Sequence, residues 1–302
     1  MSEFLQQLVN GLTSGSVYAL IALGYTMVYG ILELINFAHG EIYMIGAYLG
    51  ILLLTFFTAV GLTQNHLALS LFLVFIGAAV YCAGYGLTLE RVAYRPLRHA
   101  NRLSPLISAI GMSIFLQNYV MLAQGSADKV FPHILNPEPI TVLGVPVGPL
   151  QIFIILTSIV LMIGLHLFVR KTRLGKAMRA TAQDKRMAGL VGIDINRVIA
   201  ITFVIGSILA SAAGVMVAMY YGLVNFFIGY GAGIKAFTAA VLGGIGNIPG
   251  AMLGGLILGL VESLGASYIS SEYKDVFAFL ILIGVLILRP SGLLGEKISE
   301  KV

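Results

Sequence analysis

Residues 42–89 read IYMIGAYLGILLLTFFTAVGLTQNHLALSLFLVFIGAAVYCAGYGLTL, and no Asp, Glu, Lys or Arg interrupts them. A helix crosses the roughly 30 Å hydrocarbon core of a membrane with about 20 apolar residues. This stretch is long enough for two crossings, and Gly61, Gln64 and Asn65 suit a turn between them. The segment therefore predicts two membrane-spanning helices.

Working outward, the same pattern fills most of the chain. Further stretches free of charged residues are 4–32, 103–127, 139–169, 198–234, 236–261 and 276–288. The last is short, but Lys274 and Arg289 at its ends can snorkel to the interfaces. Only 10% of the residues are charged, against about 25% in soluble proteins. We predict an all-α, polytopic membrane protein with eight to nine transmembrane helices, some of them interrupted, in one domain over residues 1–302.

Basic residues are gathered in three segments. Of the 18 lysines and arginines, fifteen lie in 90–102, in 170–197 or in the tail from Arg289, which includes Lys297 and Lys301. The positive-inside rule places these segments in the cytoplasm, the N-terminus outside and the C-terminus inside, with nine crossings. A re-entrant segment within 31–60 or 233–268 would change that parity. The net charge of +5 belongs to one membrane face, so we expect lipid and not nucleic acid as a partner.

Glycines recur at a spacing of four residues. The pairs and series are Gly11/Gly15, Gly46/Gly50, Gly246/Gly250/Gly254 and Gly255/Gly259. Small residues at this spacing let helices approach closely in lipid. The pattern predicts tight packing within the chain, and a subunit interface or a pathway is the alternative.

Two segments combine an Asn, glycines and a helix interruption inside apolar runs, at 35–41 and at 243–250. Each is followed by a glycine-spaced helix, which suggests that the two segments form a weak internal repeat. Unwound backbone at membrane depth needs a cavity or protein around it, and broken helices point to the substrate path of a transporter. The candidate pathway residues are Asn36, Phe37, His39, Gly40, Glu41, Asn247, Pro249 and Gly250. The alternative for each segment is a simple turn between two spans.

Few charged residues lie within or beside the spans. They are Glu33, Glu41, Lys235 and Glu262, and none is at helical spacing from another. A proton relay needs a chain of such groups. The scatter argues against a proton-coupled carrier, although Glu41 next to His39 keeps that alternative open.

No sequence motif indicates an enzyme. The single Cys82 can form no internal disulfide, the five histidines lack metal-ligand spacing, and the His-Glu-x-x-His and Gly-x-Ser-x-Gly patterns are absent. Gly175-Lys176 lacks the upstream glycine and following hydroxyl of a P-loop. We therefore expect a non-enzymatic chain that binds no metal, cofactor or ATP, so that any ATP is bound by another chain.

The basic loop 170–197 predicts short helices. Asp184 suits a helix N-cap, Gly192 suits a stop, and Asp194 can cap the span that begins near Arg197. Small residues such as Ala180 and Ala188 would let a partner groove close over this segment. It either lies on the inner membrane face or docks a cytoplasmic partner.

Four motifs resemble a known family. They are INFAHGE (35–41), ERVAYRPLR (90–98), SAIGMS (108–113) and KAFTAAVLGGIG (235–246), and together they are similar to the LivH-type permease of bacterial branched-chain amino-acid ABC importers. The resemblance extends over essentially the whole chain and implies a multi-pass protein of the bacterial inner membrane. It also implies a second related permease, two cytoplasmic ATPase subunits that carry ATP and Mg²⁺, and a periplasmic substrate-binding protein.

The resemblance further assigns the 170–197 loop to ATPase docking. The residues concerned are Arg179, Ala180, Gln183, Asp184, Ala188, Gly192 and Ile193. The implied function is transport of leucine, isoleucine or valine by alternating access. Alternatives are a urea or amide substrate within the same superfamily, an ATP-independent carrier or channel, and a membrane scaffold without transport. The external loop 128–149 matches no motif of the family.

Overall fold

The computed structural model describes residues 2–98, 100–101, 103–132, 138–142 and 144–295. The α-helices are α1 (Ser2–Leu32), α2 (His39–Ala59), α3 (Leu62–Asn65), α4 (Leu67–Leu89), α5 (Leu103–Gln124), α6 (Pro149–Lys171), α7 (Arg173–Gln183), α8 (Lys185–Leu190), α9 (Ile195–Tyr221), α10 (Ile228–Gly243), α11 (Ile248–Tyr268) and α12 (Lys274–Leu288). A π-helical turn covers Glu90–Tyr94, and 3₁₀ turns cover Arg95–Leu97 and Ser271–Tyr273. The strands β1 (Lys129–Val130) and β4 (Leu223–Val224) form one antiparallel pair, and β2 (Ile140–Val142) and β3 (Val145–Val147) form another.

The helices have the lengths and the apolar character that a membrane requires. Within the described residues, 7 helices are long and apolar enough to cross a membrane, and α10 is a shorter apolar helix. The charge-free stretch 42–89 folds into α2 and α4, joined at Gly61 and α3. This confirms the predicted polytopic all-α fold and its two crossings in that stretch.

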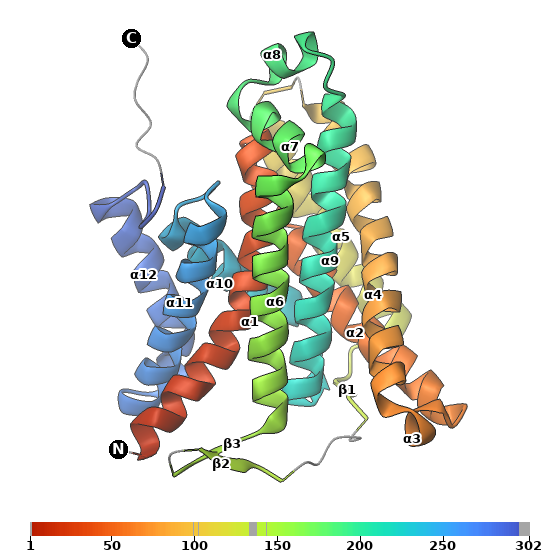
Figure 1. Ribbon diagram of the computed structural model, residues 1–302, viewed down its shortest axis with the longest axis vertical. Helices are drawn as coiled ribbons and strands as arrows, with labels where there is room; N and C mark the ends of the chain where they lie inside the picture. Colours follow the sequence, from red (N-terminus) through yellow and green to blue (C-terminus); the bar gives the residue numbers. More distant parts are fainter. Residues whose placement is uncertain (1, 99, 102, 133–137, 143, 296–302) are drawn as a thin grey trace.

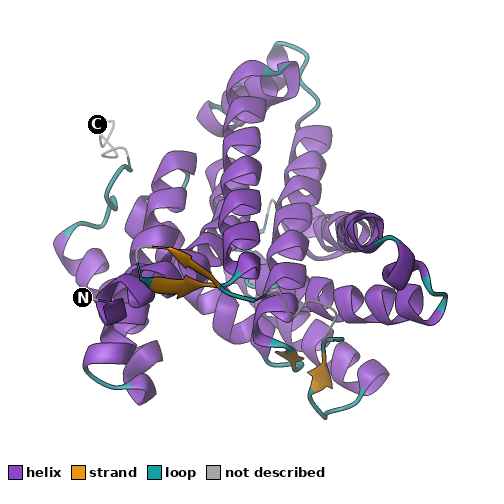
Figure 2. Cartoon of the chain, turned by 60° about the horizontal axis from the view of Figure 1, so that its bottom comes forward, coloured by secondary structure: helices purple, strands orange, loops and turns teal. Residues whose placement is uncertain are grey.

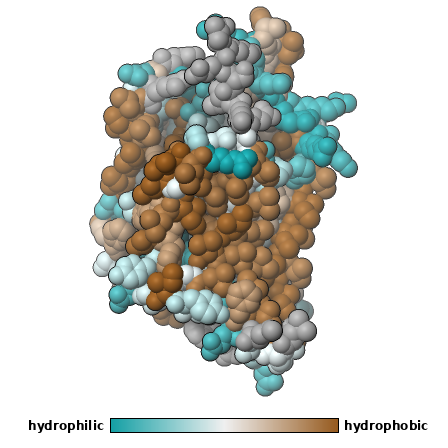
Figure 3. Space-filling model, turned by 90° about the vertical axis from the view of Figure 1, so that its left-hand side faces the viewer, coloured by the Kyte–Doolittle hydropathy of each residue, from teal (hydrophilic) through white to brown (hydrophobic). Residues whose placement is uncertain are grey.

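The two ends of the bundle differ in charge. Helices α7 and α8 lie at one end, called here the α7–α8 end, and the N-terminus, α3 and the strand pairs lie at the other, the strand end (Figures 1 and 2). Arg98 Nη1 donates to Asn196 Oδ1 over 2.6 Å, which brings the basic segment 90–98 to the same end as 170–197. A broad apolar face separates the polar ends (Figure 3). Of the predicted cytoplasmic basic residues, Arg102, Lys297 and Lys301 lie outside the described part of the chain.

Glycine lets the central helices pack backbone to backbone. A Cβ at Gly11 would lie 2.9 Å from Leu260 Cα, and one at Gly15 would lie 2.9 Å from Leu256 Cα. A Cβ at Gly46 would lie 2.6 Å from Ser211 Cα. These pairs join α1 to α11 and α2 to α9, so the predicted close packing within the chain is confirmed.

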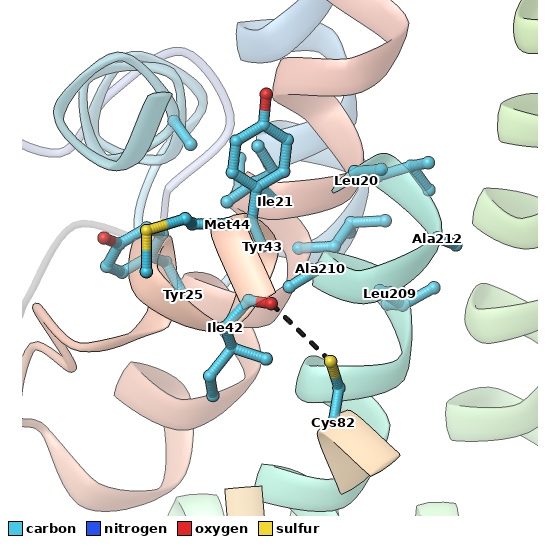
Figure 4. Packing of buried hydrophobic residues seen from close by; sticks show 14 of the residues in the cluster. Leu20, Ile21, Tyr25, Ile42, Tyr43, Met44, Cys82, Leu209, Ala210 and Ala212 are labelled. Atoms are coloured by element: carbon cyan, nitrogen blue, oxygen red, sulfur yellow. Dashed lines mark hydrogen bonds between the residues drawn. The ribbon is translucent and has the colours of Figure 1, made fainter. Parts of the chain in front are cut away.

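The core lies where α1, α2, α4 and α9 meet. Figure 4 shows its side chains, with the Cys82 thiol on α4 directed at the carbonyl of Ile42 on α2, at 3.7 Å. Cys82 is fully buried and unpaired with any other cysteine. It behaves as the small buried residue that its apolar surroundings predict.

Two groups of helices are arranged as inverted counterparts. Helix α1 runs from the strand end toward the α7–α8 end, whereas α9 runs the opposite way (Figure 1). Helix α1 packs against α10 and α11, which also pack against each other. In the same way, α9 packs against α2 and α4, which pack against each other, and the pairs α1–α9 and α2–α10 also pack together. Helices α1, α2 and α4 therefore correspond to α9, α10 and α11 about an axis in the membrane plane, as in many transporters.

Candidate functional site

The first helix break lies between α1 and α2. Glu33, with φ of 59°, turns the chain out of α1, and the backbone returns into the bundle before α2 starts at His39. The imidazole of His39 fills a space left by Gly24, which lies about two turns before the end of α1. Helix α2 therefore begins inside the bundle, as the candidate pathway segment 35–41 predicts.

A buried hydrogen bond holds this break in place. The hydroxyl of Tyr94 donates to Asn36 Oδ1 at 2.9 Å, and both side chains are buried. Tyr94 ends the π-helical turn that follows α4, and such turns are frequent at functional sites. The sequence analysis did not connect Tyr94 with Asn36, because 58 residues separate them.

His39 and Glu41 each keep one buried polar atom without a hydrogen-bond partner among the described residues. For His39 the atom is Nε2, and the Tyr25 ring packs edge-on against the imidazole, with centroids 5.1 Å apart. Glu41 Oε1 accepts a 3.0 Å hydrogen bond from Ser113 Oγ, whereas Oε2 is unpaired. Unpaired polar atoms are costly in a membrane interior, which makes them candidates for contact with a polar ligand or water.

A second break, between α9 and α10, meets the first one. Gly222, with φ of 72°, ends α9, and α10 starts at Ile228. A Cβ at Gly229 would lie 2.8 Å from the carbonyl oxygen of Gly40, so the first turns of α2 and α10 touch. The structural counterpart of 33–38 is thus 222–227, and not the 243–250 segment that the sequence suggested.

The sequence carries a signal for this second break. Asn225-Phe226 with Gly229 repeats the Asn-Phe-x-x-Gly pattern of Asn36-Phe37 with Gly40. In both, the Asn carbonyl accepts a hydrogen bond from the backbone N–H three residues on, at 3.0 Å and 3.3 Å. This signal is weaker than that of Gly246, Asn247 and Pro249, which are stronger breakers of a helix.

A cavity of about 370 Å³ opens where the breaks meet. It is lined by Tyr25, Phe37, Ile110, Ser113, Ile114, Gln117, Phe227, Gly229, Tyr230, Gly233 and Ile234. Its volume is typical of small-molecule sites, and its wall is mostly aromatic and aliphatic with a few polar groups. Such a cavity offers dipolar contacts and room for an apolar side chain.

Of the predicted pathway residues, only Phe37 is among those that line the cavity; Asn36, His39, Gly40 and Glu41 belong to the first break but not to the cavity wall, and the remaining three lie elsewhere. Asn247 caps α11 by accepting a hydrogen bond from the Gly250 N–H at 2.9 Å, and its Nδ2 donates to the Leu294 carbonyl at 2.7 Å. Pro249 follows in the first turn of α11. These residues form the turn between α10 and α11 at the α7–α8 end, apart from the cavity. Their part in a substrate path stays a prediction.

The loop 172–194 has the predicted helices and caps. Asp184 Oδ1 accepts from the N–H groups of Arg186 and Met187 at 2.8 and 3.0 Å, and Asp194 Oδ1 accepts from that of Arg197 at 3.1 Å. Gly192 has a φ of 86°, as a helix stop requires.

The exposed surface of this loop differs in part from the predicted docking set. Arg179, Gln183, Asp184 and Gly192 are exposed, Ala180 and Ile193 are half-buried, and Ala188 is buried. The sequence analysis missed three exposed apolar side chains, Met187, Leu190 and Val191, with exposed fractions of 58%, 80% and 73%. These three residues are called the α8 patch below. An apolar patch exposed beside basic residues is typical of a protein contact.

The loop 172–194 rests on the end of α1. The amine of Lys185 donates to the Leu32 carbonyl at 3.5 Å. A hollow of about 80 Å³ lies between α7, the end of α1 and the α10–α11 turn, with Met178, Gly30 and Gly246 in its wall. A displacement of α7 would therefore reach α1 directly before its break.

Of the four charged residues that lie within or beside the spans, Lys235 and Glu262 form an ion pair, which their separation in the sequence did not reveal. Lys235 on α10 contacts Glu262 on α11 and Asp275 on α12, each at 2.7 Å, and Lys274 lies 3.3 Å from Glu262. Among the described residues, no group of three or more His, Cys, Asp or Glu side chains could hold a metal ion.

Comparison with known proteins places the chain in a family. Residues 7–286 match the family model described as the permease component of branched-chain amino acid transport systems. The chain is 54% identical to the high-affinity branched-chain amino acid transport system permease protein BraD of Pseudomonas aeruginosa and 51% identical to LivH of Escherichia coli, over 99% of this chain and 98% of each relative. A probable LivH of Methanocaldococcus jannaschii is 27% identical over 93% of this chain and 89% of that protein.

No solved structure shows a significant match. The family match covers nearly the full length, and it agrees with the apolar helices and with the motifs around the first break. The chain is a multi-pass protein of the bacterial inner membrane, and it belongs to the family of permease components of branched-chain amino acid transport systems.

Proposed function

We propose that this chain is the membrane pathway subunit of an ATP-driven importer for leucine, isoleucine and valine. It works with a second related permease, two cytoplasmic ATPase subunits that bind ATP and Mg²⁺, and a periplasmic binding protein. The observation that carries the proposal is the cavity between the two breaks, with Phe37 from one and Phe227 from the other in its wall. The substrate assignment rests on the relatives, which are named as branched-chain amino acid permeases.

The cavity suits such a cargo chemically. A branched-chain amino acid is a zwitterion without net charge and has an aliphatic side chain. Ile110, Ile114 and the two phenylalanines offer apolar contact, whereas Ser113 and Gln117 offer hydrogen bonds. Unwound backbone at both breaks adds further polar groups at membrane depth.

The ATPase subunits drive transport from the α7–α8 end. The ATPase subunits bind the α8 patch and the exposed residues Arg179, Gln183 and Asp184. Closure of these subunits around ATP moves α7, which presses on α1 through Lys185 and the hollow beside Gly30. The break after α1 then changes its exposure from the outer to the inner side, as alternating access requires.

Reconstitution tests the proposal. The chain is purified alone and together with its four partner subunits, and L-leucine uptake into liposomes is measured with and without ATP. We expect uptake only with the partners and ATP. Leucine transport by the chain alone would show an ATP-independent carrier and overturn the proposal. Urea and short amides serve as competitors, and their transport in place of leucine would overturn the substrate assignment.

A variant tests the pathway itself. Ile114→Trp fills the cavity, and we expect at least about a tenfold loss of uptake. Leu122→Trp on the same helix is the matched control, because its side chain is 82% exposed on the outside of the bundle. Equal uptake by the two variants would place the substrate path elsewhere.

A further inference from the structure

A second cavity of about 370 Å³ lies toward the strand end, between α1, α9 and α11. It is separate from the cavity at the breaks, and no lining residue is shared. Its walls are Gln7, Asn10, Ser14, Tyr220, Tyr221, Gly259, Glu262, Ser263, Ala266, Ser267, Ser271 and Lys274. Most of these side chains carry hydrogen-bonding groups, which is unusual between membrane helices and indicates a wet or ligand-binding space.

The cavity contains a buried carboxylate that is only partly used. Glu262 is 1% exposed, and its Oε1 accepts from Lys235 at 2.7 Å, with Lys274 at 3.3 Å. Its Oε2 has no hydrogen bond of good geometry among the described residues, and the hydroxyl of the buried Tyr18 on α1 lies beside this carboxylate. A buried carboxylate oxygen that lacks a well-formed hydrogen bond is costly, and a ligand that donates one would lower that cost.

The charges around Glu262 balance. Lys235 also contacts Asp275 at 2.7 Å, so two carboxylates face two amines in this cluster. A balanced cluster has no excess negative charge to hold a free cation. It does match a ligand that brings one positive and one negative group, because Glu262 Oε2 can accept from an ammonium while Lys274, at the cavity wall, donates to a carboxylate.

We propose that this cavity is a second binding site for the cargo, which takes the zwitterionic head group of an α-amino acid between Glu262 and Lys274. The identity of the cargo rests on the proposed function. The position at the strand end, opposite the docking loop, makes it the site met first by an amino acid that arrives from outside. Tyr220 and Tyr221 close it on the α9 side, and small side chains at Ser263, Ala266 and Ser267 leave room for the ligand.

A fluorescent reporter tests the site. The chain has no tryptophan, so Tyr221→Trp in the full-length chain, held in lipid nanodiscs, gives a single reporter at this cavity. We expect a saturable change in emission with L-leucine. We expect no change with 4-methylpentanoate, which lacks the ammonium, with 3-methylbutylamine, which lacks the carboxylate, or with NaCl.

Three further substitutions make the reporter specific. Ala266→Leu fills the cavity while it keeps the charged residues, and it should weaken leucine binding at least about tenfold. Val261→Leu, exposed on the outer face of α11, is the matched control and should leave it unchanged. Glu262→Gln keeps the shape of the side chain, removes its charge, and should weaken leucine binding as Ala266→Leu does.

The outcomes separate this inference from the proposed function. An absent response to leucine, or an equal response from the Ala266→Leu variant, overturns the site. A response to NaCl or to the amine alone identifies a cation site and overturns the zwitterion assignment. A Tyr230→Trp reporter at the cavity between the breaks, together with ATP-driven uptake, reports on the proposed function independently of these results.

Discussion

At the scale of single residues, the first break depends on one long-range contact. The Tyr94 hydroxyl, at the end of the π-helical turn after α4, fixes Asn36 by a hydrogen bond. Because both partners are buried, loss of either leaves a polar group without a partner. Tyr94 thereby connects the basic segment after α4 with the break.

We expect Tyr94→Phe to lower the stability of the chain by about 1–3 kcal/mol, because Asn36 Oδ1 then loses its donor. Asn36→Ala and the double variant complete a double-mutant cycle. The cycle should give a coupling energy of about 0.5–3 kcal/mol between Tyr94 and Asn36. Thermal unfolding of the purified chain measures each value. Tyr268→Phe, at an exposed position, is the control. Additive effects of the two substitutions would contradict a direct bond.

Local residue roles were predictable from the sequence, whereas distant pairs were not. Asp184 and Asp194 cap helices that start at the next residue, so their roles depend on neighbours in the chain. Lys235 and Glu262 meet only because α10 and α11 pack together, and no local pattern reveals this. Burial of Ala188 likewise depends on how α8 packs against the rest of the chain. That packing buries Ala188 and leaves Met187, Leu190 and Val191 exposed.

At the scale of elements, α1 and α11 owe their closeness to glycine. A Cβ at Gly15 would meet the backbone of Leu256, which cannot rotate away as a side chain could. The contact is thus set by the backbones of both helices. The spacing of four residues between glycines predicted close packing. It did not predict which helix each glycine series would pack against.

We expect Gly15→Ala to destabilise the chain by about 1–3 kcal/mol, because overpacking forces the two helices apart. Gly164→Ala in α6 is the matched control, since nothing lies within 4 Å of its added Cβ. That change should be neutral or stabilise the chain by up to about 1 kcal/mol. Denaturation of the purified chain gives both values. Equal destabilisation by Gly15→Ala and Gly164→Ala would show that the close approach of α1 and α11 at Gly15 does not determine the stability.

The short helix α8 presents the surface that we expect the ATPase subunits to bind. Leu190→Asp together with Val191→Asp should abolish capture of the ATPase subunits and ATP-driven uptake, because a buried unpaired charge opposes docking. The chain should still insert into the membrane. Co-purification from membranes measures capture. Leu174→Asp places the same charge near the start of α7 as a control. Undiminished capture by the double variant would refute docking through the α8 patch.

At the scale of the whole molecule, inverted counterparts meet at one point. The α1–α2 and α9–α10 breaks face each other at Gly40 and Gly229, so a change that opens one break outward has an equivalent that opens the other inward. Hydropathy predicted the spans, because length and apolar character suffice for that. It could not predict which spans are counterparts, since helix pairing joins residues far apart in the chain.

Cysteine labelling tests alternating access. Cys82 is buried, so a Cys82→Ala background allows single cysteines to be introduced. We expect a cysteine at Phe37 or Phe227 to react with a membrane-impermeant thiol reagent at rates that differ at least about tenfold between nucleotide-free and ATP-bound complexes. A cysteine at Leu122 outside the cavity should show no such dependence. Rates unaffected by nucleotide at all three positions would argue against a moving gate.

The pairing of α1 with α11 also imposes an order on assembly. Helix α1 is made first, yet its Gly11 and Gly15 meet the backbone of α11, roughly 240 residues later. At about 5–20 residues per second, synthesis takes roughly 12–50 s to supply that partner. During this time Gln7, Asn10 and Ser14 on α1 face the translocation machinery or lipid without the polar groups of α11. The first helix must therefore stay in the membrane through its own hydrophobicity and its earlier partners α6 and α9 until α11 has emerged from the ribosome.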